Sequence, residues 1–172
     1  MGTAWQGSLR VLFGLAWTKL LMKKGADKIN DRLTNMAFKS YYKHIKPVRT
    51  PFDWLSVDPE IVDQYIADPL CGGLPTVGLF HEMLKGFQFN QKFRNLDKMD
   101  GKTPILLISG AKDPVGDMGA GVRQTYAEFK RSGIADCEIK LYPGLRHEIL
   151  NEKSLQQTVF EDIGNWIEEK MA

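Results

Sequence analysis

The first hundred residues show the apolar spacing of helices and no run that is typical of a strand. In the segment after residue 8, apolar side chains recur at steps of three and four, which places them on one helix face. They are Leu9, Leu12, Phe13, Ala16 and Leu20. Gly25 is suited to end this helix. Further helices are predicted over 27–42, from Asp58 onward and over roughly 76–89.

From residue 100 onward, strands and helices alternate. Ile105–Ser109 is almost entirely apolar, as a strand covered on both faces should be, and Cys137–Tyr142 is the second predicted strand. A helix over about 120–132 separates them, and a last helix follows with Ser154 as its N-cap. This order predicts a right-handed crossover and a parallel pair. Because two parallel strands do not complete a sheet, at least one strand should have an edge that awaits a neighbour.

The composition is that of an ordinary globular chain. Of the 172 residues, 43% are apolar and 26% are charged, which argues against bulk disorder. The net charge of +2 favours no nucleic-acid surface. Cys71 and Cys137 are too few for a disulfide framework, so a reduced, cytoplasmic setting is expected. The apolar run 11–17 is far too short to span a bilayer, and we expect a soluble protein.

Two residues with catalytic chemistry follow directly on the two predicted strands. Asp113 lies in the turn after the first strand, and His147 lies in the segment after the second. Because the carboxyl ends of parallel strands meet at one edge of a sheet, these residues should come together. Considered singly, an Asp before Pro is usually a turn former, and such a His is usually a surface residue. Jointly they match the Asp…His order of α/β-hydrolases, in which a carboxylate orients the imidazole that activates a hydroxyl.

The nucleophile of such a triad is missing from the sequence. No Gly-x-Ser-x-Gly motif occurs in the 172 residues. The serines without these flanking glycines are Ser8, Ser40, Ser56, Ser109, Ser132 and Ser154. Ser109 stands nearest to the acid, but it ends a strand and should pack there or bond to the backbone. Cys71 and Cys137 are weak alternatives, since free cysteines are usually buried and inert.

No metal and no cofactor are expected. Neither His81-Glu82 nor His147-Glu148 is followed by a second histidine at the spacing of a zinc metalloprotease. The glycines of 116–121 are spaced wrongly for a dinucleotide or phosphate cradle.

The segments around these residues resemble the monoacylglycerol lipase and lysophospholipase branch of the serine α/β-hydrolases. The most specific part is Tyr142-Pro-Gly-Leu-Arg-His-Glu148, and the stretch 52–71 resembles the helical lid of that branch. The resemblance covers nearly the whole chain and implies Asp113 as the triad acid and His147 as the general base. It implies an α/β fold class with a helical lid or cap region over 1–99. The C-terminal part of the hydrolase core would occupy 100–172, and the nucleophile-bearing N-terminal half would be absent.

The resemblance implies part of a serine hydrolase that cleaves lipid-like carboxylic esters such as monoacylglycerol or lysophospholipid. The serine would come from outside this sequence, and the chain alone would be inactive. Phe13, Trp17 and Leu21 are predicted to roof the acyl-chain pocket. The expected partners are a small lipid or ester substrate, a membrane surface touched by the lid, and a complementary N-terminal half or a second copy; no nucleic acid is expected. The alternatives are a non-catalytic module that binds an apolar ligand or self-associates, and a truncated gene product.

Overall fold

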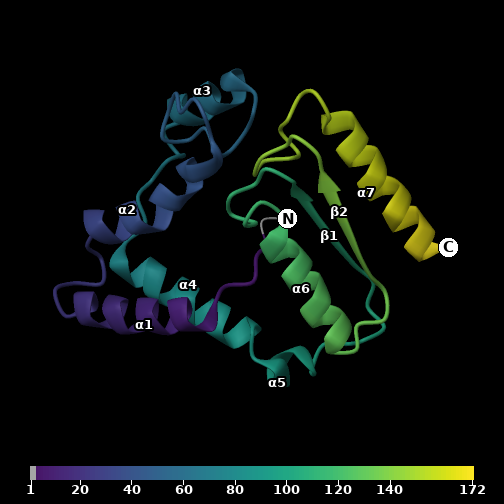
Figure 1. Ribbon diagram of the computed structural model, residues 1–172, viewed down its shortest axis with the longest axis horizontal. Helices are drawn as coiled ribbons and strands as arrows, with labels where there is room; N and C mark the ends of the chain where they lie inside the picture. Colours follow the sequence, from purple (N-terminus) through teal and green to yellow (C-terminus); the bar gives the residue numbers. More distant parts are fainter. Residues whose placement is uncertain (1–2) are drawn as a thin grey trace.

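The computed structural model describes residues 3–172 and shows a group of helices beside a small α/β unit (Figure 1). Residues 1 and 2, with which the predicted helical region begins, lie outside the described part. In chain order the elements are α1 (Ser8–Met22), α2 (Asp31–Lys39), the 3-10 helix η1 (Ser40–His44), α3 (Pro59–Ala67), α4 (Val77–Asn90), α5 (Phe93–Leu96), β1 (Ile105–Gly110), α6 (Ala120–Arg131), β2 (Cys137–Tyr142) and α7 (Gln156–Met171).

The predicted strands form a parallel pair whose register runs from Ile105 opposite Cys137 to Gly110 opposite Tyr142. Helix α6 covers one face of the pair and α7 covers the other (Figure 1). Val122 of α6 packs with Leu107 and Cys137, whereas Val159 of α7 packs with Ile108 and Tyr142. Within residues 3–172 the sheet consists of these two strands only, so each has an outer edge without a strand beside it there.

Side-chain caps decide where several helices begin. Asp58 caps α3 by accepting the N–H of Glu60, and Thr76 caps α4 by accepting the N–H of Leu79. In the same way Asn30 caps α2 by accepting the N–H of Leu33, at 3.0 Å. The helix predicted over 27–42 is therefore shorter, and it continues as the 3-10 turn η1 from Ser40.

The prediction that Ser154 caps the last helix was wrong. Helix α7 begins after Leu155, and no side chain caps its first turn. The residues before it form turns, in which Leu155 and Gln156 donate backbone hydrogen bonds to the carbonyl oxygen of Glu152. The helix therefore begins one residue later than a cap at Ser154 predicts.

Helix α1 packs on α4 through small residues and not through its predicted apolar face. Gly14 faces Leu84, and the hydroxyl of Thr18 lies 2.8 Å from Nδ1 of His81. A Cβ at Gly14 would come within 2.8 Å of the Leu84 side chain, which shows how close the helices are. Leu9 and Phe13 of the predicted face are instead 84% and 63% exposed. Among residues 3–172 no helix combines the length and the apolar character needed to cross a bilayer.

Candidate functional site

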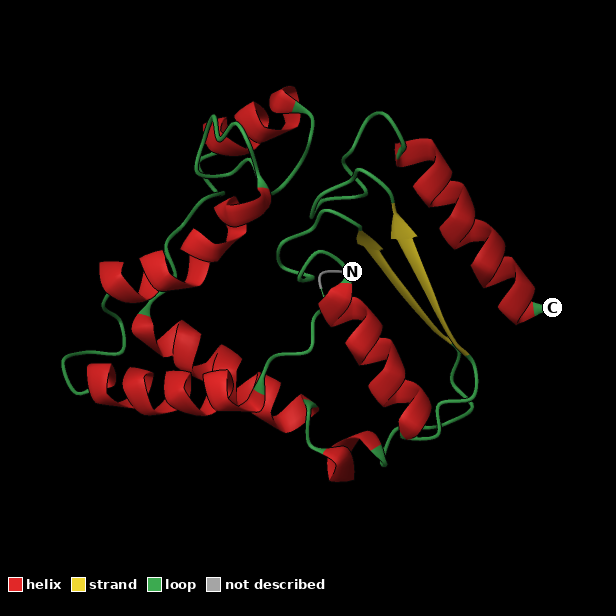
Figure 2. Ribbon diagram, in the orientation of Figure 1, coloured by secondary structure: helices red, strands yellow, loops and turns green. Residues whose placement is uncertain are grey.

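The loops that follow β1 and β2 meet at the carboxyl ends of the strands (Figure 2). There, Nδ1 of His147 lies 3.0 Å from Oδ2 of Asp113. The structure thus brings together the two residues that the sequence places after successive strands, although 34 positions separate them in the chain.

A glycine at the end of β1 allows this approach. A Cβ at Gly110 would lie 2.1 Å from the carbonyl oxygen of Arg146 and 2.3 Å from that of Leu145. The loop after β2 therefore rests directly on the end of β1, where only glycine fits. Lys112 further ties the two loops by donating its backbone N–H to the carbonyl oxygen of Leu145, at 2.9 Å.

Asp113 is fully buried, with an exposed fraction of 0%. Its Oδ1 accepts the N–H of Val115 at 2.8 Å, and its Oδ2 accepts the hydroxyl of Ser109 at 3.3 Å in addition to facing His147. These donors compensate a carboxylate that water cannot reach. The side chain is held in one orientation, as a residue that aligns an imidazole must be.

The turn after Asp113 holds a strained backbone conformation. Asp117 and Met118 both adopt left-handed backbone angles, with φ of 50° and 53°. Such angles cost of order 1 kcal/mol or more in a non-glycine residue and tend to occur at functional sites. The N–H of Met118 donates to the carbonyl oxygen of Asp113 at 2.8 Å, so the strained turn folds back on the acid.

Aromatic side chains from the helical region stand against the imidazole. The ring of Trp54 lies 5.2 Å from that of His147, and the ring of Tyr41 lies 5.1 Å from Trp54. Burial, with a smaller contribution from the nearby Asp113 charge, raises the pKa of Tyr41, which keeps the phenol neutral. Sequence reasoning did not single out either aromatic residue, and the only signal for Trp54 was its place in the lid-like stretch 52–71.

The two buried serines of the described chain, Ser56 and Ser109, are held in structural hydrogen bonds. Ser109 is buried and donates to Gly110 and Asp113, on the acid side of the histidine, as expected for a residue that ends a strand. Ser56 is buried and donates to Glu152. Among residues 3–172 no serine hydroxyl is hydrogen-bonded to His147.

A cavity of about 780 Å³ opens beside Trp54. Its other lining residues come from α2, η1, α3 and the loops near them: Thr34, Asn35, Phe38, Lys39, Tyr42, Pro51, Phe52, Tyr65, Gly72, Gly73 and Leu74. Most of these are apolar or aromatic, as is usual for a ligand cavity. Trp54 thus contacts the histidine and also lines the cavity.

None of the three residues predicted to roof an acyl pocket lines the cavity beside Trp54. Phe13 and Trp17 line a second, open hollow of about 670 Å³ together with Leu20 and Met36. Leu21 does not line this hollow, and it packs together with Trp17 on the buried cluster built around Leu33, Val77 and Phe80.

Neither cysteine is activated as a nucleophile. Cys137 is buried in the sheet and Cys71 lies in a turn, and burial raises the pKa of both thiols. Raised pKa values leave little thiolate, which is the reactive form. Within residues 3–172 no group of three or more His, Cys, Asp or Glu side chains is arranged to hold a metal ion.

Comparison with known families agrees with the geometry of this site. The model of the family described as Hydrolase_4, serine aminopeptidase, S33, matches residues 4–154. The chain belongs to this family. A relative, the monoacylglycerol lipase of Mycolicibacterium smegmatis, is 35% identical over 118 residues, which are 67% of this chain and 38% of that protein.

Solved structures place the chain in the α/β-hydrolase fold. A thermostable carboxyl esterase from Bacillus coagulans superposes with a TM-score of 0.88 at 26% identity, over 98% of this chain and 55% of the esterase. A lipase in its open form gives a TM-score of 0.84 at 21% identity, over the same shares. The monoacylglycerol lipase of Paleococcus ferrophilus gives 0.64 at 21% identity, over 95% and 53%. The chain therefore spans about half the length of these solved proteins and 38% of the mycobacterial relative.

Proposed function

We propose that this chain supplies the acid and the histidine of a serine hydrolase that cleaves lipid-like carboxylic esters of the monoacylglycerol or lysophospholipid type. The observation that carries the proposal is the 3.0 Å separation between His147 Nδ1 and the fully buried Asp113. Family membership and the similarity to a monoacylglycerol lipase support the ester substrate. The nucleophilic serine would come from sequence outside these 172 residues.

In this mechanism His147 is the general base. Asp113 accepts the Nδ1–H and thereby holds the imidazole in the tautomer whose Nε2 can take a proton. Nε2 removes the proton of the serine hydroxyl as the oxygen attacks the ester carbonyl, and the imidazolium then gives that proton to the leaving alcohol. The buried carboxylate stabilises the imidazolium while it exists.

The proposed division of the chain follows the same logic. Residues 1–99 would form the lid or cap, and 100–172 would form the C-terminal part of the core. The cavity beside Trp54 would hold the apolar part of the substrate, because it is the large cavity that shares a residue with the histidine environment. The exposed Leu9 and Phe13 would let the lid touch a lipid surface.

Ester hydrolysis and labelling by a fluorophosphonate test this proposal. The chain alone should neither hydrolyse a short p-nitrophenyl ester nor be labelled, and joining it to a segment that carries Gly-x-Ser-x-Gly should restore both. His147→Asn should abolish the restored hydrolysis, whereas His44→Asn should not, because His44 is exposed. Labelling of a single serine in the chain alone, or restored activity that survives His147→Asn, would refute the proposed roles.

The alternative is a non-catalytic module that binds an apolar ligand, and the size of the cavity favours it as the second candidate. In that case the chain should bind a fluorescent fatty acid, and Leu74→Arg, at the cavity wall, should weaken binding. The joined protein would then show no hydrolysis. Binding together with hydrolysis would favour the enzyme.

A further inference from the structure

A short segment of the helical region, residues 53–57, is held on two sides by the loop that carries His147. Glu152 is fully buried, and both of its side-chain oxygens accept hydrogen bonds from this segment. Oε2 accepts the hydroxyl of Ser56 at 2.9 Å, and Oε1 accepts the N–H of Val57 at 2.9 Å. These two partners lie almost 100 positions earlier in the chain, and Oε1 also accepts the N–H of Arg146 at 3.5 Å.

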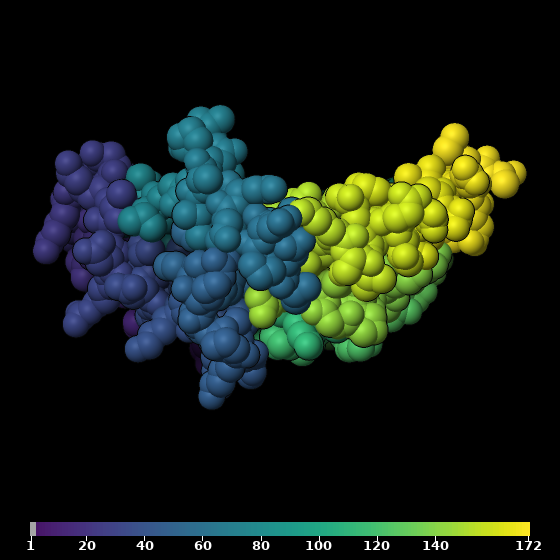
Figure 3. Space-filling model, turned by 90° about the horizontal axis from the view of Figure 1, so that it is seen from above, coloured from purple at the N-terminus to yellow at the C-terminus, as the bar shows by residue number. Residues whose placement is uncertain are grey.

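Arg146 holds the same segment from its other end. Its Nη1 donates to the carbonyl oxygens of Asp53 and Ser56, the second at 2.8 Å. Between these contacts the two backbones run together, since Glu148 donates its N–H to the carbonyl oxygen of Leu55 at 2.8 Å. Figure 3 shows the blue surface of this part of the helical region abutting the yellow-green surface of the histidine loop. We call the side chains of Arg146 and Glu152 together the clamp.

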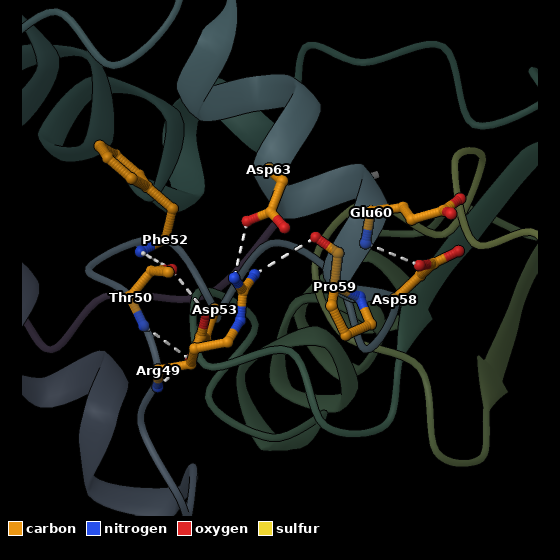
Figure 4. A network of polar contacts seen from close by, with 8 residues as sticks. All are labelled: Arg49, Thr50, Phe52, Asp53, Asp58, Pro59, Glu60 and Asp63. Atoms are coloured by element: carbon orange, nitrogen blue, oxygen red, sulfur yellow. Dashed lines mark hydrogen bonds and ion pairs between the residues drawn. The ribbon is translucent and has the colours of Figure 1, made fainter.

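Further hydrogen bonds hold the turn that leads into the clamped segment. The carboxylate of Asp53 accepts the N–H and the hydroxyl of Thr50, and Arg49 reaches across to Asp63 of α3 at 2.7 Å (Figure 4). This network closes the turn that precedes Trp54. A shift of the clamp would therefore move Trp54 with the segment, because the turn cannot absorb the movement.

We propose that Glu152 is a positioning residue that fixes Trp54 against the imidazole of His147; this inference rests on the proposed role of His147 as general base. A buried carboxylate that loses its donors is left unsatisfied, so the segment cannot detach while Glu152 stays in place. The backbone N–H of His147 donates to the carbonyl oxygen of Trp54 at 3.4 Å, which joins the two residues directly. The clamp therefore keeps one wall of the site fixed, and any opening of the helical region must occur away from residues 53–57.

Nuclear magnetic resonance of the full 172-residue chain tests the clamp without any need for catalysis. The two readouts are the dipolar contact between the indole of Trp54 and the imidazole of His147, and the downfield Nδ1–H signal of the bond to Asp113. The chain has three histidines, so His44 and His81 serve as internal references. We expect Glu152→Gln to lose the indole contact and to broaden the Nδ1–H signal, because an amide places a donor where a carboxylate oxygen accepted.

Glu148→Gln is the matched control, since it makes the same change in the same loop, and the side chain of Glu148 accepts a hydrogen bond from Asn151 and makes none with the segment. It should keep both signals. If Glu152→Gln also keeps both, the proposal is wrong. If Glu152→Gln also loses the native chemical shifts of His44 and His81, the variant has unfolded, and Ser56→Ala, which removes one donor to Glu152, is measured in its place. Ser56→Ala should then weaken the same two signals, and a variant that keeps both would contradict the proposal. Both signals are measured without substrate. The result therefore tests the clamp separately from the proposed hydrolase activity.

Discussion

Replacing Gly110 by alanine should push apart the loops that carry Asp113 and His147. The new Cβ would lie 2.1 Å from the carbonyl oxygen of Arg146 and 2.3 Å from that of Leu145, and both are backbone atoms. Non-bonded carbon and oxygen atoms rarely come closer than about 3 Å, so the loop must retreat by roughly 1 Å. The separation between His147 and Asp113, now 3.0 Å, would then exceed hydrogen-bond range.

Overpacking of this kind should also lower the free energy of unfolding, by about 1–3 kcal/mol. Urea unfolding measures this loss, and the Nδ1–H signal of His147 reports the separated pair. Gly164→Ala in α7 is the matched control, because a Cβ there meets nothing within 4 Å. It should stabilise the helix by about 0.5–1 kcal/mol. A Gly110→Ala chain that unfolds at the parental urea concentration and keeps the Nδ1–H signal would refute the reasoning.

Three further predictions concern the acid, the core beside the site and the pH dependence of stability. In a protein joined to its nucleophile, Asp113→Asn should lower kcat by roughly 10⁴-fold, because the imidazole takes the wrong tautomer, and a loss below tenfold in steady-state ester hydrolysis would contradict the role. Ile149→Ala should cost about 2–5 kcal/mol in urea unfolding, since Ile149 is fully buried beneath the histidine loop, and a cost near zero would contradict this packing. Burial raises the pKa of Asp53, but hydrogen bonds from Thr50 and from backbone amides outweigh it and hold that pKa below its usual range. The stability contributed by Asp53 should therefore be present near neutral pH and be lost as pH falls below about 4. The melting temperature of Asp53→Asn should accordingly lie below that of the parent chain at neutral pH and approach it below about pH 4. An equal difference in melting temperature at both pH values would contradict this prediction.

Strand positions were predictable because they depend on short-range patterns. Cys137–Tyr142 is observed as predicted, and the first strand extends the prediction by one residue to Gly110. The caps at Asp58 and Thr76 are equally local, because each side chain bonds to a backbone N–H two or three residues away. The wrong prediction of a cap at Ser154 shows where such local prediction fails. The identity of one residue suggested a cap, but the backbone turns of the preceding residues decide where the helix begins.

The pairing of Asp113 with His147 could be predicted because parallel strands impose it. Trp54 and Glu152 could not be found in the same way. Trp54 contacts His147 and Glu152 bonds to Ser56, so each contact joins the helical region to a loop more than 90 positions away, and no strand register relates the two segments. The spacing in α1 likewise marks a face as apolar but does not say what covers it, and Leu9 and Phe13 of that face are exposed.

By itself, then, the sequence determined the order of elements, the parallel pair and the two residues at its carboxyl end, because those follow from periodicity and from the geometry of a crossover. Only the tertiary structure decided which helix faces are buried, where the large cavity lies and which aromatic ring stands against the histidine. These depend on close contacts such as Gly14 on Leu84 and Glu152 on Ser56. Contacts of this kind are selected by the fit of whole surfaces, which no short stretch of the chain encodes.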